Sequence, residues 1–270
     1  MIVDTAALAR QTLAMVDAGR YDGPAGVVDF AASVRAALAG TRVITPAEAA
    51  ALVDRPRRDL GADATFEVGD AGTAEAARRL AVRGAVTVLN FASARQVGGG
   101  FLGGATAQEE DLCRCSALYR CLERGDAYYR ANRAEGGALA TDHAIWSPAV
   151  PFFRGRDHGL LPAPFEVSVI TSPAPNTNRA KGHEVALLVD TFRRRAAQVL
   201  GIAANEPPRA LVLGAWGCGA FGGDPRVVAD AFGAALDAGF VRSFTHITFA
   251  VLVRSWPDPN NLAAFAARFG

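Results

Sequence analysis

Two adjacent glutamates, Glu109 and Glu110, follow a glycine-rich stretch and stand at the start of a predicted helix. A carboxylate at a helix N-terminus can simply complement the positive end of the helix dipole. Neighbouring helical residues, however, point about 100° apart, so the two side chains cannot serve the same purpose. Because they come directly after a loop suited to bind phosphate, we expect one of them to face a ligand.

The glycine-rich stretch before the glutamates runs from Gly98 to Gly104, and a second one covers residues 214–225. Glycine accepts positive φ and lets a ligand approach the main chain. Consecutive amides in such loops form concave anion sites, and a following helix N-terminus adds to the attraction. Either loop alone could be an ordinary tight turn. Together, each between a predicted strand and a predicted helix, they favour a clamp on a pyrophosphate.

The combination of a pyrophosphate clamp with a carboxylate indicates glycosidic chemistry at a ribose. Other phosphate-binding motifs are missing from the sequence. No GxxxxGK[ST] occurs, which disfavours a P-loop nucleoside triphosphatase, and no GxGxxG opens the first strand–helix unit. The formal net charge of +1 gives no electrostatic argument for bulk binding to nucleic acid.

Cysteines and histidines show no metal-ligand spacing. None of the cysteines forms a CxxC pair, so we interpret them as small buried thiols, and we expect neither a metal nor a cofactor. The histidines are scattered, and we assign none of them to catalysis. The residues concerned are Cys113, Cys115, Cys121, Cys218, His143, His158, His183 and His246. No signal peptide and no membrane-spanning run is evident, so we expect a cytoplasmic protein without a membrane partner.

Strands and helices alternate from about residue 64 onward. The strand-like segments are ATFEVGD, AVTVLNF, HAIWSPAV, FEVSVITSP, RALVLGAW and THITFAVLV. This alternation predicts an α/β domain with a mixed sheet covered on both faces. Ligands in such sheets bind beyond the carboxyl ends of the strands, which is where both glycine loops fall.

A long helix is predicted near 180–200, with its apolar residues at a 3.6-residue period. Those residues are Val185, Leu188, Val189, Phe192, Ala196, Val199 and Leu200. The arginine run at 193–195 is interpreted as a solvated face of this helix.

The first 60 residues are predicted to be mainly helical. An amphipathic helix is expected at 3–19, followed by short helical patches that prolines interrupt. The clearest helix start is TPAEAAALV at 45–53, with Thr45 as N-cap, Pro46 at the first helical position and Glu48 at the third.

A longer pattern joins the first glycine loop to the glutamates. GGG at 98–100, seven residues, and QEE at 108–110 resemble the GGG-x(6–8)-QEE signature of the poly(ADP-ribose) glycohydrolases, which are macrodomain-fold enzymes. The N-terminal extension and the NFASA stretch look like the bacterial-type branch. The resemblance covers most of the chain, most densely 64–253. It implies a macrodomain-like mixed sheet flanked by helices, with a helical accessory segment at 1–60 and a catalytic domain at 61–270.

The resemblance also implies an activity and its residues. It implies hydrolysis of the ribose–ribose O-glycosidic bond of poly(ADP-ribose), mainly from chain ends, releasing ADP-ribose without a metal. Glu110 would be the catalytic residue, and Glu109 would hydrogen-bond ribose hydroxyls beside the scissile bond. Gly98, Gly99 and Gly100 would belong to the catalytic loop. Gln108, the first residue of QEE, is counted with the ligand-binding residues.

The remaining ligand contacts are assigned by the same resemblance. Residues 216–223 look like the diphosphate loop, in which we assign Gly217, Cys218, Gly219, Ala220 and Phe221 to the ligand. Phe221 would pack on the distal ribose, although ordinary loop packing is the alternative.

The GD pair and the Asn-rich strand end extend this match. Asp70 would accept from the adenine amino group or, alternatively, cap the helix at 72–83. Asn90 would lie near the distal ribose. Ser93 stands where general macrodomains often have a second asparagine, which fits the glycohydrolase branch. Asn176 is a weaker contact candidate.

Two other functions remain open at this point. One is a non-hydrolytic ADP-ribose-binding module, which would need no QEE. The other is a hydrolase of mono-ADP-ribose attached to protein or nucleic acid, whose pocket would be nearly the same. The expected partners are poly(ADP-ribose), ADP-ribose and ADP-ribosylated proteins, with no direct nucleic-acid binding and a monomeric state.

Overall fold

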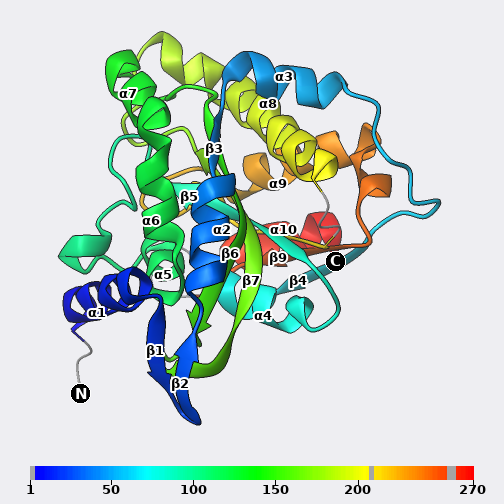
Figure 1. Cartoon of the computed structure of the whole chain (residues 1–270). Coiled ribbons are helices and arrows are strands. Elements are labelled where there is room, and N and C mark those ends of the chain that lie inside the picture. The colour runs from blue at the N-terminus through cyan, green and yellow to red at the C-terminus, as the bar shows by residue number, and fades with distance from the viewer. Residues whose placement is uncertain (1–3, 207–209, 254–259) are drawn as a thin grey trace.

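The computed structural model describes residues 4–206, 210–253 and 260–270 (Figure 1). Its centre is a seven-stranded mixed sheet in the order β3-β6-β7-β5-β8-β9-β4. The strands are β3 (Arg42–Ile44), β4 (Thr65–Gly69), β5 (Val86–Ala92), β6 (Ala144–Arg154), β7 (Leu160–Pro173), β8 (Ala210–Leu213) and β9 (His246–Ala250). Every strand predicted from residue 64 onward is therefore present.

Five neighbouring strands, from β7 through β5, β8 and β9 to β4, run parallel. At the other end of the sheet, β6 pairs antiparallel with β7, and β3 pairs antiparallel with β6. The carboxyl ends of the five parallel strands therefore meet at one edge. Along β8, Leu211 and Leu213 face one hydrophobic core and Val212 the other, as the two-residue period of a strand requires. Both faces of the sheet are thus buried.

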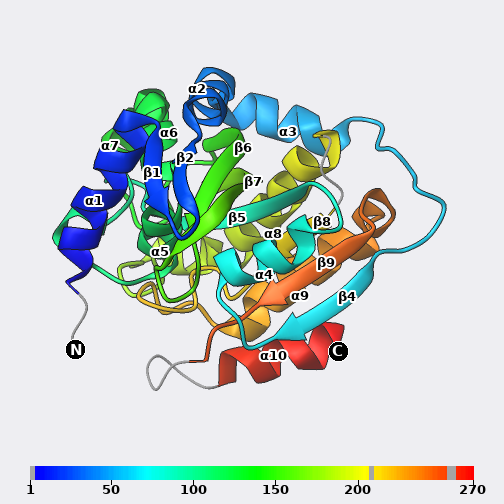
Figure 2. The same ribbon diagram turned by 60° about the horizontal axis from the view of Figure 1, so that its bottom comes forward.

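Helices cover the two faces in separate groups (Figure 2). One core contains α1 (Thr5–Ala18), α2 (Ala31–Gly40), α4 (Thr73–Ala81), α5 (Gln108–Cys115), α6 (Leu118–Leu122) and α7 (Asp126–Glu135). The other contains α3 (Pro46–Asp54), α8 (His183–Asn205), α9 (Pro225–Asp237) and α10 (Asn260–Phe269). None of the helices in the described ranges has the length and hydropathy that a membrane crossing requires.

The first 60 residues contain strands that the sequence analysis did not predict. A hairpin of β1 (Arg20–Gly23) and β2 (Gly26–Asp29) occupies residues 20–29, with Pro24 in its turn, and the expected helical patches follow it as α2 and α3. Tyr21 packs against Phe30 and Phe153, with ring centroids 5.4 Å apart in both pairs. The strands are too short for a clear local pattern. The hairpin also depends on the contact of Tyr21 with distant Phe153, which no local pattern can reveal.

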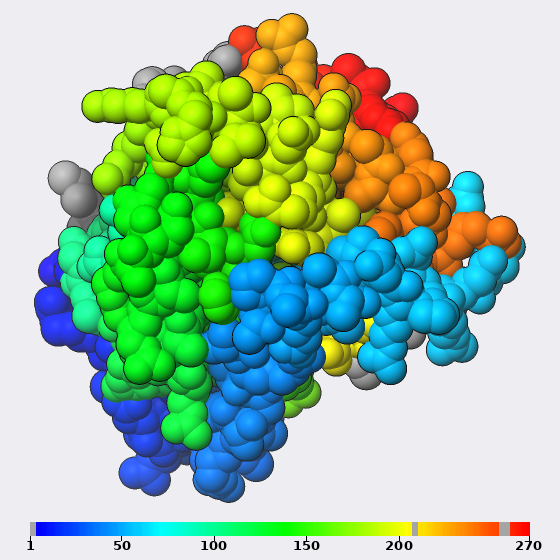
Figure 3. Space-filling view, turned by 90° about the horizontal axis from the view of Figure 1, so that it is seen from above, coloured from blue at the N-terminus to red at the C-terminus, as the bar shows by residue number. Residues whose placement is uncertain are grey.

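The helix start at Thr45 is confirmed, since its side chain accepts a hydrogen bond from the backbone N–H of Glu48 at 3.2 Å. The helix that follows, α3, packs against α8, and Figure 3 shows their surfaces side by side in blue and yellow. Because β3 pairs with β6, residues 1–60 contribute to the main sheet as well as to both helical layers. The domain boundary at residue 60 stays a prediction.

The long helix α8 is buried along only part of the predicted apolar face. Phe192, Ala196, Val199 and Leu200 are buried, whereas Val185 is 54% exposed and Val189 40% exposed. Residues 183–190 are all exposed or half-buried, so none of the described segments fully covers the first two turns of the helix. The 3.6-residue period identifies a face, but it does not tell how far the neighbouring elements extend.

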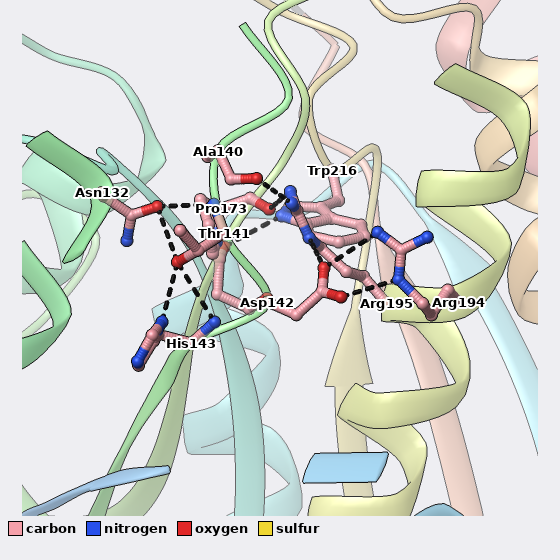
Figure 4. Close-up of polar contacts among 10 residues, drawn as sticks. Asn132, Ala140, Thr141, Asp142, His143, Pro173, Arg194, Arg195 and Trp216 are labelled. Carbon is pink, nitrogen blue, oxygen red and sulfur yellow. Dashed lines mark hydrogen bonds and ion pairs between the residues drawn. The ribbon is translucent and has the colours of Figure 1, made fainter. Parts of the chain in front are cut away.

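The arginine run at 193–195 is not uniformly solvated, which corrects the sequence interpretation. Arg195 is 1% exposed, and its guanidinium donates to Asp142 and to the backbone carbonyls of Pro173 and Ala140 (Figure 4). Arg194 binds the same carboxylate from the solvent side. Burial lowers the pKa of the Arg195 guanidinium, and the charge of Asp142 only partly opposes that shift. Arg195 thus ties α8 to the end of β7.

We expect Arg195→Ala to lower the free energy of unfolding by about 3–5 kcal/mol, because it leaves half-buried Asp142 and two carbonyls with one partner fewer. Arg194→Ala is the matched control, since it removes a solvent-exposed partner of the same carboxylate and should cost about 0–1 kcal/mol. Urea unfolding of both variants measures the difference. Equal losses would contradict the assigned role of Arg195.

Candidate active site

The residues singled out in the sequence lie at the edge where the parallel strands end. The first glycine loop follows β5 and the second follows β8, and these two strands are paired in the sheet. Asp70 directly follows β4, and Asn176 follows β7. Parallel pairing therefore gathers segments from residues 70 to 221 at one edge, the place where open α/β sheets bind ligands.

Glu109 is 3% exposed and is held by two donors. Its Oε2 accepts from the backbone N–H of Ser93 at 2.8 Å, and its Oε1 accepts from the Asn90 side chain at 3.1 Å. Asn90 is itself fully buried at the end of β5 and also donates to Thr171 of β7 at 3.2 Å. Asn90 therefore positions Glu109 from the sheet.

Glu110 is 7% exposed and faces the glycine loop. Its Oε1 accepts from the backbone N–H of Gly100 at 2.8 Å. Its Oε2 is buried and has no hydrogen-bond partner among the described residues. A buried, unpaired carboxylate oxygen is uncommon in a folded protein and calls for a functional explanation.

The glycines of the first loop are required by the closeness of both carboxylates. Gly98 and Gly99 adopt φ values of 61° and 58°, which disfavour residues with a side chain. A Cβ on Gly99 would collide with Oε1 of Glu110 and lie 3.0 Å from Oε2 of Glu109. The backbone at Gly99 is thus the surface on which the two carboxylates rest.

Burial raises the pKa of Glu109 to about 8. The N–H of Ser93 and the amide of Asn90 favour the carboxylate, while the neighbouring charge of Glu110 opposes it. Because burial is the largest of these effects, Glu109 retains its proton near neutral pH.

Gln108 uses its side chain to hold the start of α5 on the sheet. Its oxygen accepts from the N–H of Phe91 at 2.8 Å, and its nitrogen donates to the carbonyl of Leu89 at 2.8 Å and to Thr73 at 3.1 Å. Gln108, the first residue of the QEE motif, therefore holds the start of α5 on β5 and α4. It thereby fixes the positions of both glutamates on α5.

Asp70 does not cap the following helix, which excludes the alternative considered from the sequence. The N-cap of α4 is Gly72, and no side chain bonds to that helix start. Asp70 is exposed and accepts from the backbone N–H of Val253, at 2.8 Å, just beyond β9. Its place at the ends of β4 and β9 is compatible with a ligand contact.

The second glycine loop is closed by its own backbone and by a residue that the sequence analysis missed. Gly223 donates to the carbonyl of Gly217 at 3.0 Å, and Gly222 donates to that of Gly219 at 2.9 Å. Asn178 donates through its side chain to Ala220 and through its backbone to Phe221. The sequence offered only Asn176, whose Oδ1 is buried without a partner among the described residues.

Three further residues of this loop, Cys218, Phe221 and Trp216, differ from one another in burial and contacts. Cys218 is buried, and burial raises the pKa of its thiol to about 12, so it is a packing residue rather than a reactive one. Phe221 is half-buried at the outer part of the loop. Trp216 anchors the loop to the end of β7, because its indole N–H donates to the carbonyl of Ser172 at 3.1 Å.

Helix α1 touches the first glycine loop, which no local sequence signal indicates. The Thr5 hydroxyl donates to the carbonyl of Gly104 at 2.6 Å, and Thr12 donates to that of Arg114 in α5. Arg114, 1% exposed, in turn donates to the carbonyl of Ala105. The N-terminal segment thus supports the loop and the carboxylate helix together.

Sequence spacing gave no metal-ligand set, but the fold brings three potential ligands together. The ligand atoms of Asp111, Cys115 and His158 all lie within 4.8 Å of one another. The signal was missed because His158 lies 43 residues beyond Cys115 in the chain. All four cysteines are buried and free, as predicted.

A macrodomain-like α/β fold with paired carboxylates on a glycine loop defines the class, as the sequence predicted. Comparison with known families then identifies the member: the model of the microbial-type PARG catalytic domain, where PARG stands for poly(ADP-ribose) glycohydrolase, matches residues 9–155. The chain belongs to this microbial-type PARG family. No curated protein sequence matches the chain.

Solved structures agree over nearly the whole chain. Poly(ADP-ribose) glycohydrolase from Thermomonospora curvata is 43% identical, covers 98% of this chain and 99% of its own, and has a TM-score of 0.93. The same enzyme bound to the inhibitor ADP-HPD is 42% identical over the same shares, with a TM-score of 0.91. The enzyme from Deinococcus radiodurans in complex with ADP-ribose is 43% identical, covers 89% of this chain and 98% of its own, and has a TM-score of 0.82.

We expect Gly99→Ala to reduce turnover roughly 10²-fold, because its Cβ would displace both carboxylates, and a shift of about 1 Å at a reacting group has that effect. Gly103→Ala, in the same loop, is the matched control: a Cβ there meets no atom within 4 Å and the backbone φ is ordinary. Steady-state rates of the two variants test this. Similar rates for the two variants would show that turnover does not require the close approach of the Gly99 backbone to the two glutamates.

The raised pKa of Glu109 predicts a pH dependence of stability. The folded chain keeps a proton on Glu109 up to about pH 8, whereas the unfolded chain releases it near the ordinary pKa of 4.5. This contribution is fully present below pH 4.5 and is lost as pH rises through 8. Urea unfolding of wild type and Glu109→Gln between these limits should give diverging curves, by at most about 1.4 kcal/mol per pH unit. Parallel curves would contradict the raised pKa.

Proposed function

We propose that this protein hydrolyses the ribose–ribose O-glycosidic bond of poly(ADP-ribose) and releases ADP-ribose. The observation that carries the proposal is the buried pair of Glu109 and Glu110 on the backbone of Gly99 and Gly100, with one oxygen of Glu110 unpaired within the described part of the chain. This arrangement occurs in a chain of the microbial-type PARG family. A binding module alone would need the glycine loops but not two buried carboxylates, which are costly to desolvate.

The related structures support ADP-ribose as the recognised group. The Deinococcus radiodurans enzyme was solved in complex with ADP-ribose, and the Thermomonospora curvata enzyme was solved with ADP-HPD and as a glutamate-to-alanine mutant. We infer that the two glycine loops hold the diphosphate through their N–H groups, and that Phe221 packs on the distal ribose. Asp70 then binds the adenine amino group, and Asn90 lies near the distal ribose.

We assign the proton transfers to Glu110. Cleavage needs a proton on the leaving 2′-oxygen and stabilisation of an oxocarbenium-like centre at the anomeric carbon. As an acid, Glu110 gives its proton to the leaving oxygen; as a carboxylate, it then takes a proton from the attacking water. Its buried unpaired oxygen supports this role, since the N–H of Gly100 holds only the other one.

Glu109 has a different task in this assignment. Both of its oxygens already accept from Asn90 and Ser93, which fixes the carboxyl group against the sheet. We infer that it orients ribose hydroxyls beside the scissile bond. Gln108, whose amide is bound to β5 and Thr73, supports the site by positioning α5.

We expect Glu110→Gln to reduce turnover by roughly 10²–10⁴, the range of positioned acid–base groups, with little change in ADP-ribose affinity. Glu109→Gln should cost less in rate and more in substrate binding. Release of ADP-ribose from poly(ADP-ribose) gives kcat and KM, and the rise of the unfolding midpoint with ADP-ribose gives affinity. Near-wild-type turnover of Glu110→Gln with inactive Glu109→Gln would reverse the two roles. A mono-ADP-ribosylated protein assayed in parallel shows whether the enzyme also cleaves the bond between ADP-ribose and protein.

We further propose that residues 1–60 form an accessory segment that covers the terminal ribose, so that the enzyme acts mainly from chain ends. The contact of Thr5 with Gly104 and that of Thr12 with Arg114 support this placement. We infer that the protein is cytoplasmic, which agrees with its four buried free thiols. We also infer that its partners are ADP-ribosylated proteins. We infer that it acts as a monomer.

Cutting from chain ends predicts a product distribution. Early in the reaction, released material should be mostly ADP-ribose with few short oligomers, because an enclosed terminal ribose admits only chain ends. Gel separation of products at low conversion measures this. Abundant internal fragments at that stage would contradict the exo mode without affecting the assigned glycohydrolase activity.

A further inference from the structure

Asp111, Cys115 and His158 form a cluster separate from the carboxylate pair. Asp111 and Cys115 lie four residues apart on α5, so they share one face of that helix. His158 comes from the turn between β6 and β7, and its Nε2 lies 3.0 Å from Oδ1 of Asp111. Glu110 points instead towards Gly100, so the cluster and the reacting carboxylate use different sides of α5.

The spacing of these atoms is close to that of a zinc site. Nitrogen and oxygen ligands about 2.0–2.2 Å from a tetrahedral zinc ion stand about 3.3 Å apart, and a sulfur ligand stands slightly farther away. The observed Asp111–His158 separation is 3.0 Å, and all three ligand atoms lie within 4.8 Å of one another. Side-chain adjustments of about 1 Å would therefore bring the three around one ion.

The position of His158 is fixed by other residues. Its backbone N–H donates to Gly155 at 2.9 Å, and its carbonyl accepts from buried Arg154 at 2.7 Å. Arg154 is held in turn by Thr12 of α1 at 3.2 Å. The imidazole is thereby presented to α5 by a braced turn, which lowers the entropy that a ligand set must lose on binding.

The thiol of Cys115 lies in the hydrophobic core and makes one weak polar contact. It is 1% exposed, and its hydrogen-bond partner is the carbonyl of Gly155 at 3.8 Å, a weak contact. Asp111 and His158 remain partly open, with 32% and 19% of their side chains exposed, so an ion and a water ligand can reach the site. A set of one thiolate, one imidazole and one carboxylate suits a borderline metal such as Zn²⁺.

Charges around the cluster partly balance one another. Asp111 and Asp157 are the anionic neighbours of Cys115, and Arg114 and Arg154 are the cationic ones. Burial raises the pKa of the Cys115 thiol, so metal binding must release its proton to solvent as the sulfur–metal bond forms. Affinity should therefore increase with pH.

We propose that Asp111, Cys115 and His158 bind one Zn²⁺ ion that links the β6–β7 turn to the helix carrying the catalytic glutamates. Water supplies the fourth ligand. The ion does not face the glycine loop, so we assign it the bracing of α5 and no part in the proposed reaction. This site is independent of the proposed glycohydrolase reaction, so either can fail without the other.

The full-length chain, freed of metal by dialysis against a chelator, is titrated with Co²⁺ and then with Zn²⁺. We expect one equivalent of Co²⁺ to give a thiolate-to-cobalt charge-transfer band that Zn²⁺ abolishes. Zn²⁺ should also raise the unfolding midpoint with concentration, because it binds the folded state. Absence of the thiolate band in the wild-type protein would overturn the proposal.

Three variants locate the ion. Cys115→Ser should lose the band, and His158→Asn, which tolerates the φ of 60° at that position, should weaken binding at least tenfold. Cys121→Ser, which removes another buried thiol of the same core, should keep the band. Binding that survives both ligand variants, or that is lost in Cys121→Ser, would refute this site. If Cys115→Ser does not fold, His158→Asn on the turn decides.

Discussion

The contact between two buried carboxylates and a bare stretch of backbone governs this structure. Glu109 and Glu110 are both less than a tenth exposed, and a carboxyl group without hydrogen-bond partners is costly to bury whether it is protonated or ionised. The backbone N–H groups of Ser93 and Gly100 supply the compensation, and they reach the carboxylates only because Gly99 has no side chain. The signature GGG followed by QEE is thus one physical unit rather than two motifs.

The remainder of the fold maintains that contact from three directions. The sheet fixes Glu109 through Asn90 and fixes the helix start through Gln108. Helix α1 holds the outer end of the loop through Thr5. Since a displacement of about 1 Å at a reacting group can cost a hundredfold in rate, such bracing is part of the catalytic apparatus even where no residue touches the substrate.

The opposite side of the ligand edge depends on the buried guanidinium of Arg195 and its ion pair with half-buried Asp142. Arg195 joins α8 to the end of β7 and to the loop before β6, and Trp216 bonds to the same end of β7. Trp216 belongs to the second glycine loop, and Asn178 closes this loop from the segment after β7. The two glycine loops thereby follow adjacent strands, which fixes the separation between them.

The sequence by itself determined the class of fold, the strands from residue 64 onward and the residues of both loops. These follow from local rules: alternation along strands, glycine where positive φ is needed and carboxylates at a helix start. It also identified Thr45 as a helix cap, which is a contact between residues three apart.

Only the tertiary structure decided which members of a local pattern are buried. Arg193, Arg194 and Arg195 are equivalent in sequence, yet Arg195 alone of the three is buried, and it donates to Asp142 and to two backbone carbonyls of other segments. The hairpin at 20–29 and the cluster of Asp111, Cys115 and His158 likewise depend on partners more than 40 residues away. Local periodicity records the preferences of neighbouring residues, whereas burial and ligand clusters depend on which distant segments the sheet brings together.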